Sequence, residues 1–234
     1  MLLLNPPPRA QIVERMEGAH PRSMMEGCLR ELARLNRLLG VHAMVLAYLA
    51  RFVRPTDRHL TVLDVATGGA DLPRAFVGWA RRRGLDLRVI AIDHHPTTAV
   101  IARDNCADAM EVRVIRADAR ALPLADRSVD VAVLTTAMHH LAPADAVRAL
   151  VELSRVSRRG VIVTDLIRSR AAYLGARALA LAFLRNPLTR ADGPLSVLRA
   201  YTPAEVRALA RAAGLNGARI HHHPLFRLAL VQGT

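Results

Sequence analysis

Two acidic residues close successive apolar runs of the sequence. Asp93 ends the run VIAID, and Asp118 ends the run VIRAD. Ligands of open parallel sheets bind just beyond the carboxyl ends of the strands, where an acidic residue can take the ribose hydroxyls of a nucleoside. A single residue of this kind could simply end a turn, but two at successive strand ends favour a ligand. Together they predict a nucleoside pocket.

A glycine turn precedes these residues in the stretch VLDVATGGADLP, residues 62–73. Dinucleotide-binding folds use three glycines to bring the backbone close to a pyrophosphate at a helix N-terminus. Only Gly68 and Gly69 remain here, and Asp71 at the mouth of the helix would repel phosphate. Alternatively, Asp71 only complements the helix dipole. The turn predicts a nucleoside that lacks phosphate and carries a cationic end, as S-adenosylmethionine does.

A histidine pair, His139 and His140, follows the apolar run 129–137 in the stretch TTAMHHLAP. Histidine has an ordinary pKa of about 6.5, which suits removal of a proton from a phenol or enol near neutral pH. The alternative is that one of the two packs against the cofactor or the backbone. Both are predicted catalytic residues, and the sequence does not distinguish them.

No metal site is expected. The side chains of His221–His223 alternate across a strand, so only His221 and His223 share a face, and no third ligand is evident. Cys28 and Cys106 lie far apart without metal-ligand spacing and predict neither a zinc site nor a disulfide framework.

The elements that must position these residues alternate along the chain. Strand-like runs at 60–66, 87–93, 111–118, 129–137 and 160–166 are separated by helical patterns at 72–84, 96–107 and 143–157. Such alternation predicts right-handed βαβ units and a mostly parallel sheet. One or two amphipathic helices are expected within 28–53, and two antiparallel strands around a short turn within 218–232.

The segment 167–201 breaks the alternation. It is expected to form an apolar helix followed by a loop over 185–201. A further helix should then begin after Thr202, with Thr202 as N-cap, Pro203 at the first position and Glu205 completing a capping box.

The chain of 234 residues suits a single domain, with no membrane span and a cytoplasmic location expected. Its formal net charge is +13, and all 33 basic residues are arginine. This charge could indicate a nucleic-acid partner. Because the arginines are scattered along helices rather than gathered in a tail, a compositional bias is favoured and no nucleic acid is expected to bind. The oligomeric state is left open.

The sequence resembles the class I S-adenosylmethionine-dependent methyltransferases, and within them the small-molecule group that includes the ubiquinone and menaquinone methyltransferases. The resemblance rests on VLDVATGGADLP, AID, RADARALPLADRSVDVAVLTTAMHHL and RVSRRGVIVTDL, which span residues 60–166. It implies a Rossmann-like α/β fold with a seven-stranded, mostly parallel sheet, an antiparallel last strand and helices on both faces. It also implies a lid formed by residues 1–58 and by the insertion 167–201 in the core 59–234.

The resemblance assigns roles to the matching positions. The acid that steers the methionine amino group is Asp64, and the ribose acid is Asp93. The glycine loop falls on Ala66, Gly68 and Ala70, so two glycine positions are alanine here. The adenine-contacting pair is Asp118 and Ala119. The full set predicted to bind the cofactor, S-adenosyl-L-methionine, is Asp64, Ala66, Thr67, Gly68, Asp93, His94, Asp118, Ala119 and Thr135.

The expected acceptor is a small apolar or aromatic molecule, because the insertion that should roof it is rich in Leu and Ala. Its aromatic members are Tyr173, Phe183 and Tyr201, and its polar candidates are Asp192 and Arg199. O-methylation of a phenol or polyketide-type secondary metabolite is preferred, with C-methylation of a quinone precursor as the alternative. A DNA or RNA methyltransferase is disfavoured because aromatic residues for base stacking make up only 3% of the chain. A protein that binds the cofactor without catalysis is the third possibility.

Overall fold

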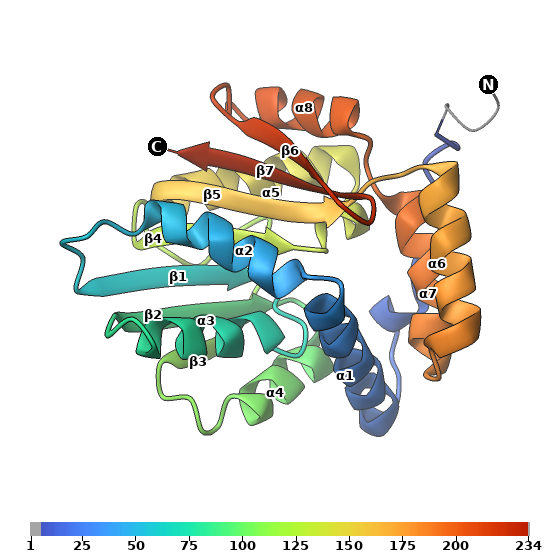
Figure 1. Ribbon diagram of the computed structural model, residues 1–234, viewed down its shortest axis with the longest axis horizontal. Helices are drawn as coiled ribbons and strands as arrows, with labels where there is room; N and C mark the ends of the chain where they lie inside the picture. Colours follow the sequence, from blue (N-terminus) through green and yellow to red (C-terminus); the bar gives the residue numbers. More distant parts are fainter. Residues whose placement is uncertain (1–5, 234) are drawn as a thin grey trace.

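The computed structural model describes residues 6–233, which form one sheet with helices on both faces (Figure 1). The strands are β1 (His59–Val65), β2 (Asp86–Asp93), β3 (Val112–Arg116), β4 (Val129–Thr135), β5 (Ser157–Leu166), β6 (Arg219–His223) and β7 (Arg227–Gly233). The helices are α1 (Arg22–Leu38), α2 (Val41–Leu49), α3 (Asp71–Arg81), α4 (Pro96–Asn105), α5 (Pro143–Val156), α6 (Arg170–Phe183), α7 (Pro187–Arg199) and α8 (Pro203–Ala212). Short 3-10 turns are η1 (Arg15–Glu17), η2 (Ala50–Phe52) and η3 (Met138–His140).

The sheet has the order β3-β2-β1-β4-β5-β7-β6. All pairs from β3 to β5 are parallel, whereas β7 runs antiparallel to both of its neighbours, β5 and β6. The predicted seven-stranded sheet with its antiparallel last strand is therefore confirmed.

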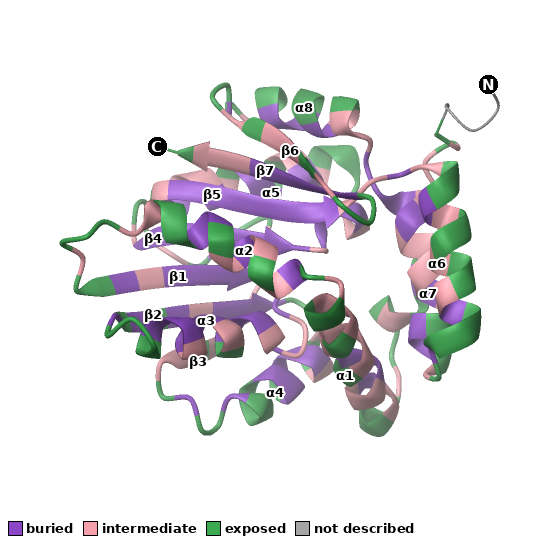
Figure 2. Cartoon of the chain, viewed as in Figure 1, coloured by how far each residue is buried: buried purple, intermediate pink, exposed green. Residues whose placement is uncertain are grey.

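Alternating side chains of the central strands enter two separate cores. Leu60 and Val62 of β1 pack with α2 and α3 on one face, and Leu63 and Val65 pack with the core that holds α5 and α8 on the other. Every residue of β4 is buried, and the central strands are almost wholly buried in Figure 2. Because both faces are covered, these strands read in the sequence as continuous apolar runs.

The segment 185–201, predicted as a loop, is instead largely the helix α7, so that prediction was wrong. Gly193 and Pro194 resemble a helix breaker, and Pro194 does remove one backbone hydrogen bond. The helix nevertheless starts well, with Pro187 at its first turn and the Asn186 side chain accepting from the Leu188 N–H at 2.9 Å. Packing of α7 against α6 and α1, which local sequence does not reveal, offsets the weak propensity.

The helix after Thr202 begins as predicted. The Thr202 hydroxyl accepts from the Glu205 N–H, and the Glu205 carboxylate accepts from the Thr202 N–H, which completes the capping box. This helix, α8, covers the sheet beside α5.

Three helices stand beyond the carboxyl ends of the parallel strands. Figure 1 shows α1, α6 and α7 on this side of the molecule, and α1 and α6 both pack against α7. Within residues 6–233, no helix combines the length and the apolar character that crossing a bilayer requires.

Candidate active site

A cavity of about 740 Å³ lies between the strand ends and the helices α1, α6 and α7. Residues of the first, second and fourth strands reach it together with the loop that follows β3. All of the predicted cofactor and catalytic residues line it: Asp64, Ala66, Thr67, Gly68, Asp93, His94, Asp118, Ala119, Thr135, His139 and His140. The structure thus brings the whole predicted set to one place.

The turn after β1 holds three residues in the left-handed backbone region. The φ angles are 57° at Ala66, 56° at Gly68 and 59° at Ala70. Only glycine adopts this region without a steric cost, which for other residues amounts to about 1–2 kcal/mol. The turn therefore keeps the shape of the glycine loop even though two of its positions are alanine.

Asp93, at the end of β2, ties this turn to the neighbouring strand. Its carboxylate accepts from the Gly68 N–H at 2.9 Å and from the His95 N–H at 3.0 Å. Burial raises the pKa of the Asp93 carboxyl, and the two backbone hydrogen bonds act in the opposite direction. Each oxygen keeps a further lone pair, so the carboxylate can also accept from a ribose hydroxyl.

Asp64 lies fully inside the cavity wall, with 2% of its surface exposed. The Thr67 hydroxyl donates to it at 2.6 Å. Burial raises the pKa of Asp64 to about 7, despite that hydrogen bond. A buried carboxyl of this kind favours a ligand with a positive charge, which would hold it ionised.

Asp71 is engaged by the N-terminal helices. It lies 2.6 Å from His42 Nε2 and accepts from the Asn36 amide at 3.2 Å. These contacts join the start of α3 to α1 and α2, so Asp71 has a structural role in addition to lining the cavity.

The residues predicted to hold adenine lie after β3. Asp118 accepts from Arg120 through both its side chain and its backbone N–H, and the pKa of Asp118 falls to about 2, mainly because of the Arg120 side chain. At the end of β4, the buried Thr135 hydroxyl has no hydrogen-bond partner within the described residues 6–233. It is a polar group left for a ligand.

His139 is fixed at the other end of the cavity by an acid from the next strand. Its Nδ1 donates to Asp165 Oδ1 at 2.8 Å, and its backbone N–H donates to Asp165 Oδ2 at 2.9 Å. Both side chains are buried. His140 lies beside it, with ring centroids 4.3 Å apart, and its Nδ1 donates to Glu17 at 2.9 Å.

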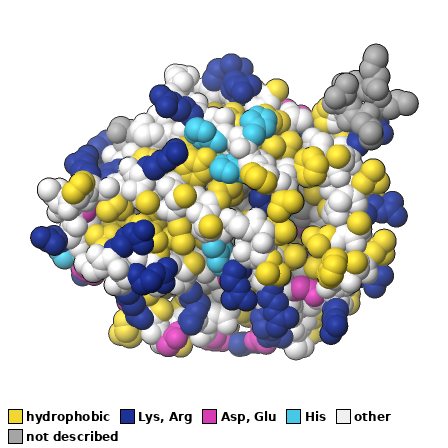
Figure 3. Space-filling model, in the orientation of Figure 1, with side chains coloured by type: hydrophobic (Ala, Val, Ile, Leu, Met, Phe, Trp, Pro, Cys, Tyr) yellow, Lys and Arg dark blue, Asp and Glu magenta, His cyan; other side chains and the backbone are white. Residues whose placement is uncertain are grey.

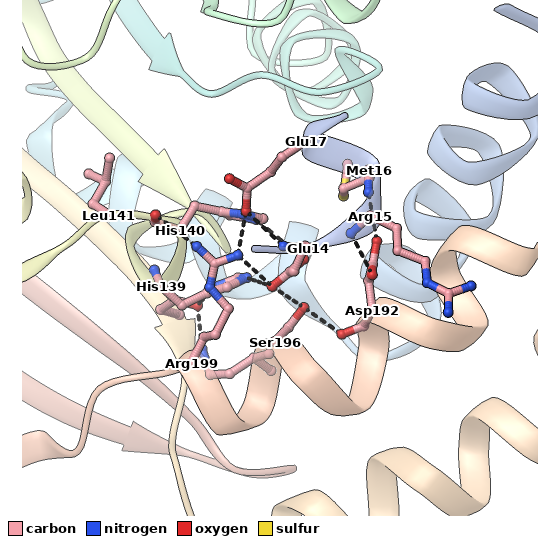
Figure 4. A network of polar contacts seen from close by, with 12 residues as sticks. Glu14, Arg15, Met16, Glu17, His139, His140, Leu141, Asp192, Ser196 and Arg199 are labelled. Carbon is pink, nitrogen blue, oxygen red and sulfur yellow. Dashed lines mark hydrogen bonds and ion pairs between the residues drawn. The ribbon is translucent and has the colours of Figure 1, made fainter. Parts of the chain in front are cut away.

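The N-terminal segment contributes an unexpected carboxylate. Glu14 is 2% exposed, accepts from the Ser196 hydroxyl at 2.9 Å and faces both histidines (Figure 4). Burial raises the pKa of Glu14 to about 7. Glu14, Glu17 and Asp165 were not predicted from the sequence. Asp165 closes the run VIVTD, so the strand-end rule could have found it, whereas no local pattern marks the two glutamates.

The aromatic and polar candidates of the insertion do not line the cavity. Phe183 is 73% exposed, and the Tyr201 hydroxyl donates to the Leu141 carbonyl at 2.7 Å from within the core. Asp192 accepts from the Arg15 and Met16 N–H groups, and Arg199 pairs with Glu17, so these two hold the N-terminal segment. Small and aliphatic side chains of α6 and α7 form the wall instead: Ala172, Gly175, Ala176, Leu179, Gly193 and Val197.

Residues 62–160 match the family model described as a methyltransferase domain. That match covers the glycine turn, Asp93 and the histidine pair, on a fold that solved methyltransferases share. The chain contains a methyltransferase domain and has the fold of the class I S-adenosylmethionine-dependent methyltransferases. Its cofactor is S-adenosylmethionine, and the left-handed turn, the buried acids Asp64 and Asp93 and the unpartnered Thr135 hydroxyl fit that molecule.

Solved structures share the fold of this methyltransferase at low identity. An S-adenosylmethionine-dependent methyltransferase from Aquifex aeolicus has a TM-score of 0.62 and 20% identity, with 92% of this chain and 99% of that chain covered. Human N-acetylserotonin methyltransferase, in complex with S-adenosylmethionine, has a TM-score of 0.66 and 14% identity, with 92% and 56% covered. A putative O-methyltransferase from Nostoc punctiforme has a TM-score of 0.58 and 18% identity, with 86% and 60% covered. No curated protein sequence matches the chain.

Proposed function

We propose that this methyltransferase transfers the methyl group to a hydroxyl of a small, apolar or aromatic acceptor, such as a phenol or polyketide-type secondary metabolite. The observation that carries the proposal is the buried His139–Asp165 pair at the end of the cofactor cavity. Methyl transfer from a sulfonium is an in-line displacement, so the protein must position the nucleophile, assist loss of its proton and exclude water.

The histidine pair suits that task. Because Asp165 accepts from Nδ1 of His139, the neutral ring carries its lone pair on Nε2, on the side away from β5. Removal of a hydroxyl proton needs such a basic nitrogen, or a cation held by it, within reach of the acceptor. His140 lies next to it and also lines the cavity, so the pair places polar groups beside the aliphatic side chains of α1, α6 and α7.

The remaining wall supports an apolar acceptor. Leu32 and Leu35 of α1 face the cavity together with Leu179 of α6, Leu184 directly after α6, and Val197 of α7. A ligand pocket with an apolar wall and a few polar groups selects molecules of the same character. We infer that α1, α6 and α7 form the lid over this acceptor.

C-methylation of a quinone precursor would use the same acidified ring hydroxyl. Structural neighbours include a protein called a putative O-methyltransferase and one called a carbon methyltransferase, and at 18% and 10% identity they do not separate the two reactions. Incubation with labelled S-adenosylmethionine and a panel of phenols and quinols, followed by mass spectrometry of the product, separates them. Methylated phenol oxygen supports the proposal, and methylation at ring carbon or of RNA alone contradicts it.

The catalytic assignment is tested by His139→Ala and His140→Ala, with Asp165→Asn as a variant that keeps the side-chain volume. General acid–base assistance contributes typically about 10²–10⁴-fold in rate. At least one histidine variant should lose that much turnover while its affinity for S-adenosylhomocysteine stays within about threefold. The exposed His59 provides a matched control as His59→Ala. A loss of cofactor affinity without loss of turnover would make the pair a binding element.

A further inference from the structure

Three metal-ligating atoms converge at the acceptor end of the cavity, from parts of the chain that are distant in sequence. A carboxylate oxygen of Glu14 and a ring nitrogen of each of His139 and His140 lie within 4.8 Å of one another. Oε1 of Glu14 is 3.6 Å from His139 Nε2, and Oε2 is 3.8 Å from His140 Nε2 (Figure 4). These separations are too long for hydrogen bonds. They are close to the spacing of roughly 3.0–3.4 Å between ligands that each lie about 2.1 Å from one ion.

The other ring nitrogens explain why no hydrogen bond fills this gap. His139 Nδ1 lies 2.8 Å from Asp165, and His140 Nδ1 lies 2.9 Å from Glu17. A carboxylate only accepts, so each Nδ1 must carry the ring proton. In the neutral rings both Nε2 lone pairs then face the Glu14 carboxylate with no donor between them. Histidines that bind metals show this arrangement, with the far N–H donated to a carboxylate.

The charged side chains around the cluster favour the binding of a cation. Three carboxylates contact the two rings, those of Glu14, Glu17 and Asp165. Among the residues that the structure describes, Arg199 is the one arginine that forms ion pairs with any of them. Arg227 is also buried and interacts electrostatically with Asp165. With neutral rings and ionised carboxylates, the three negative charges exceed these two positive charges, so the cluster favours a cation.

We propose that Glu14, His139 and His140 bind a divalent transition-metal ion, and that the N-terminal segment completes this site by bringing Glu14 over the histidine pair. Two imidazoles and one carboxylate suit Zn²⁺, Mn²⁺, Fe²⁺ or Co²⁺ rather than Mg²⁺ or Ca²⁺. All three residues line the cavity, so the open positions of the ion face the acceptor.

This site deepens the proposed function and rests on it for its role. A dication lowers the pKa of an oxygen bound to it, as zinc lowers the pKa of a bound water to about 7. The histidines would then assist proton loss by holding the ion that binds the acceptor hydroxyl, and the proton would leave to solvent. Acceptors that present a hydroxyl are the class that such an ion selects.

Metal binding to the full chain tests the proposal without any acceptor. The protein, freed of metal with a chelator, is titrated with Zn²⁺ and Mn²⁺ by calorimetry and with Co²⁺ by visible absorption. One equivalent should bind, and Glu14→Gln and His140→Ala should each weaken binding at least tenfold. Glu17→Gln should weaken it about 10–100-fold, because loss of a carboxylate behind a ligating histidine typically has that effect. The exposed pairs supply the controls Glu26→Gln and His59→Ala, which should bind as the parent does.

The outcomes separate this proposal from the proposed function. Absence of stoichiometric binding, or binding that Glu14→Gln leaves unchanged in a protein that still binds S-adenosylhomocysteine, overturns the metal site. If phenols are methylated equally well after chelation, the proposed function stands and the catalytic role of the metal ion is wrong. If one equivalent of metal binds through Glu14 and no hydroxyl acceptor is methylated, the metal site stands and the proposed function fails.

Discussion

Asp64 should make cofactor affinity depend on pH in a way that one isosteric substitution removes. Burial raises the pKa of its carboxyl to about 7, whereas the ordinary value is 3.8. If Asp64 accepts from the methionine ammonium, binding requires the ionised carboxylate. Below pH 7 the free protein holds a proton on Asp64 that must leave when the cofactor binds.

The size of the effect follows from the ionised fraction. With a pKa of about 7, roughly 1% of Asp64 is ionised at pH 5 and half at pH 7, so affinity should rise roughly 50-fold between these values. The cofactor amine, with an ordinary pKa of about 7.7–8.0, stays protonated throughout this range. Asp64→Asn should bind more weakly at pH 7, by about tenfold or more, because it lacks a hydrogen bond between charged groups.

Calorimetry with S-adenosylhomocysteine measures both quantities. Titrations at pH 5, 6 and 7 give the affinities, and paired buffers with different ionisation enthalpies count the released protons, about 0.9 per binding event at pH 6. Asp64→Asn should release far fewer protons on binding, and its affinity should change little between pH 5 and pH 7. Asp93 titrates in both proteins, so the difference between them reports Asp64 alone. Equal pH profiles for the two proteins would refute the assignment of Asp64 to the ammonium.

Three further predictions concern the cofactor turn and the surface charge. Asp93→Ala should weaken S-adenosylhomocysteine binding at least tenfold in a folded protein, because it removes the ribose acceptor and the hydrogen bond to Gly68; unchanged affinity would place the ribose elsewhere. Ala66→Gly should leave the free energy of unfolding in urea unchanged or raise it by up to about 1 kcal/mol, because Ala66 has a φ of 57°, which glycine adopts without strain. Ala178→Gly, inside the helix α6, should instead lower that free energy by about 1 kcal/mol. A large loss of stability in Ala66→Gly would contradict the strain argument. Arginines are spread over the visible face rather than gathered in one patch (Figure 3), so duplex DNA and RNA should bind weakly and with a steep salt dependence, and tight selective binding at physiological salt would contradict this.

Short-range sequence patterns were enough to predict most of the sheet and the residues at the cofactor end of the cavity. The central strands are covered on both faces, so they appear as apolar runs, and the acids Asp93 and Asp118 follow where those runs end. The carboxyl ends of parallel strands meet at one edge, which is why residues chosen from separate runs line one cavity. The capping box at Thr202 was equally local, since its two hydrogen bonds join residues three apart.

The acceptor end depended on tertiary structure. Glu14 and His139 are separated by 125 positions and meet only because Asp192 and Arg199 of α7 hold the N-terminal segment over the strand ends. Helix α7 itself depends on packing, because Gly193 and Pro194 weaken it locally while contacts with α1 and α6 stabilise it. The sequence by itself determined the succession of strands and helices along the chain, the glycine turn and the acids at the strand ends, because these follow from local backbone preference and from the period of buried side chains. Which carboxylate faces the histidine pair was decided only by the fold, since contact between distant segments follows from packing rather than from spacing.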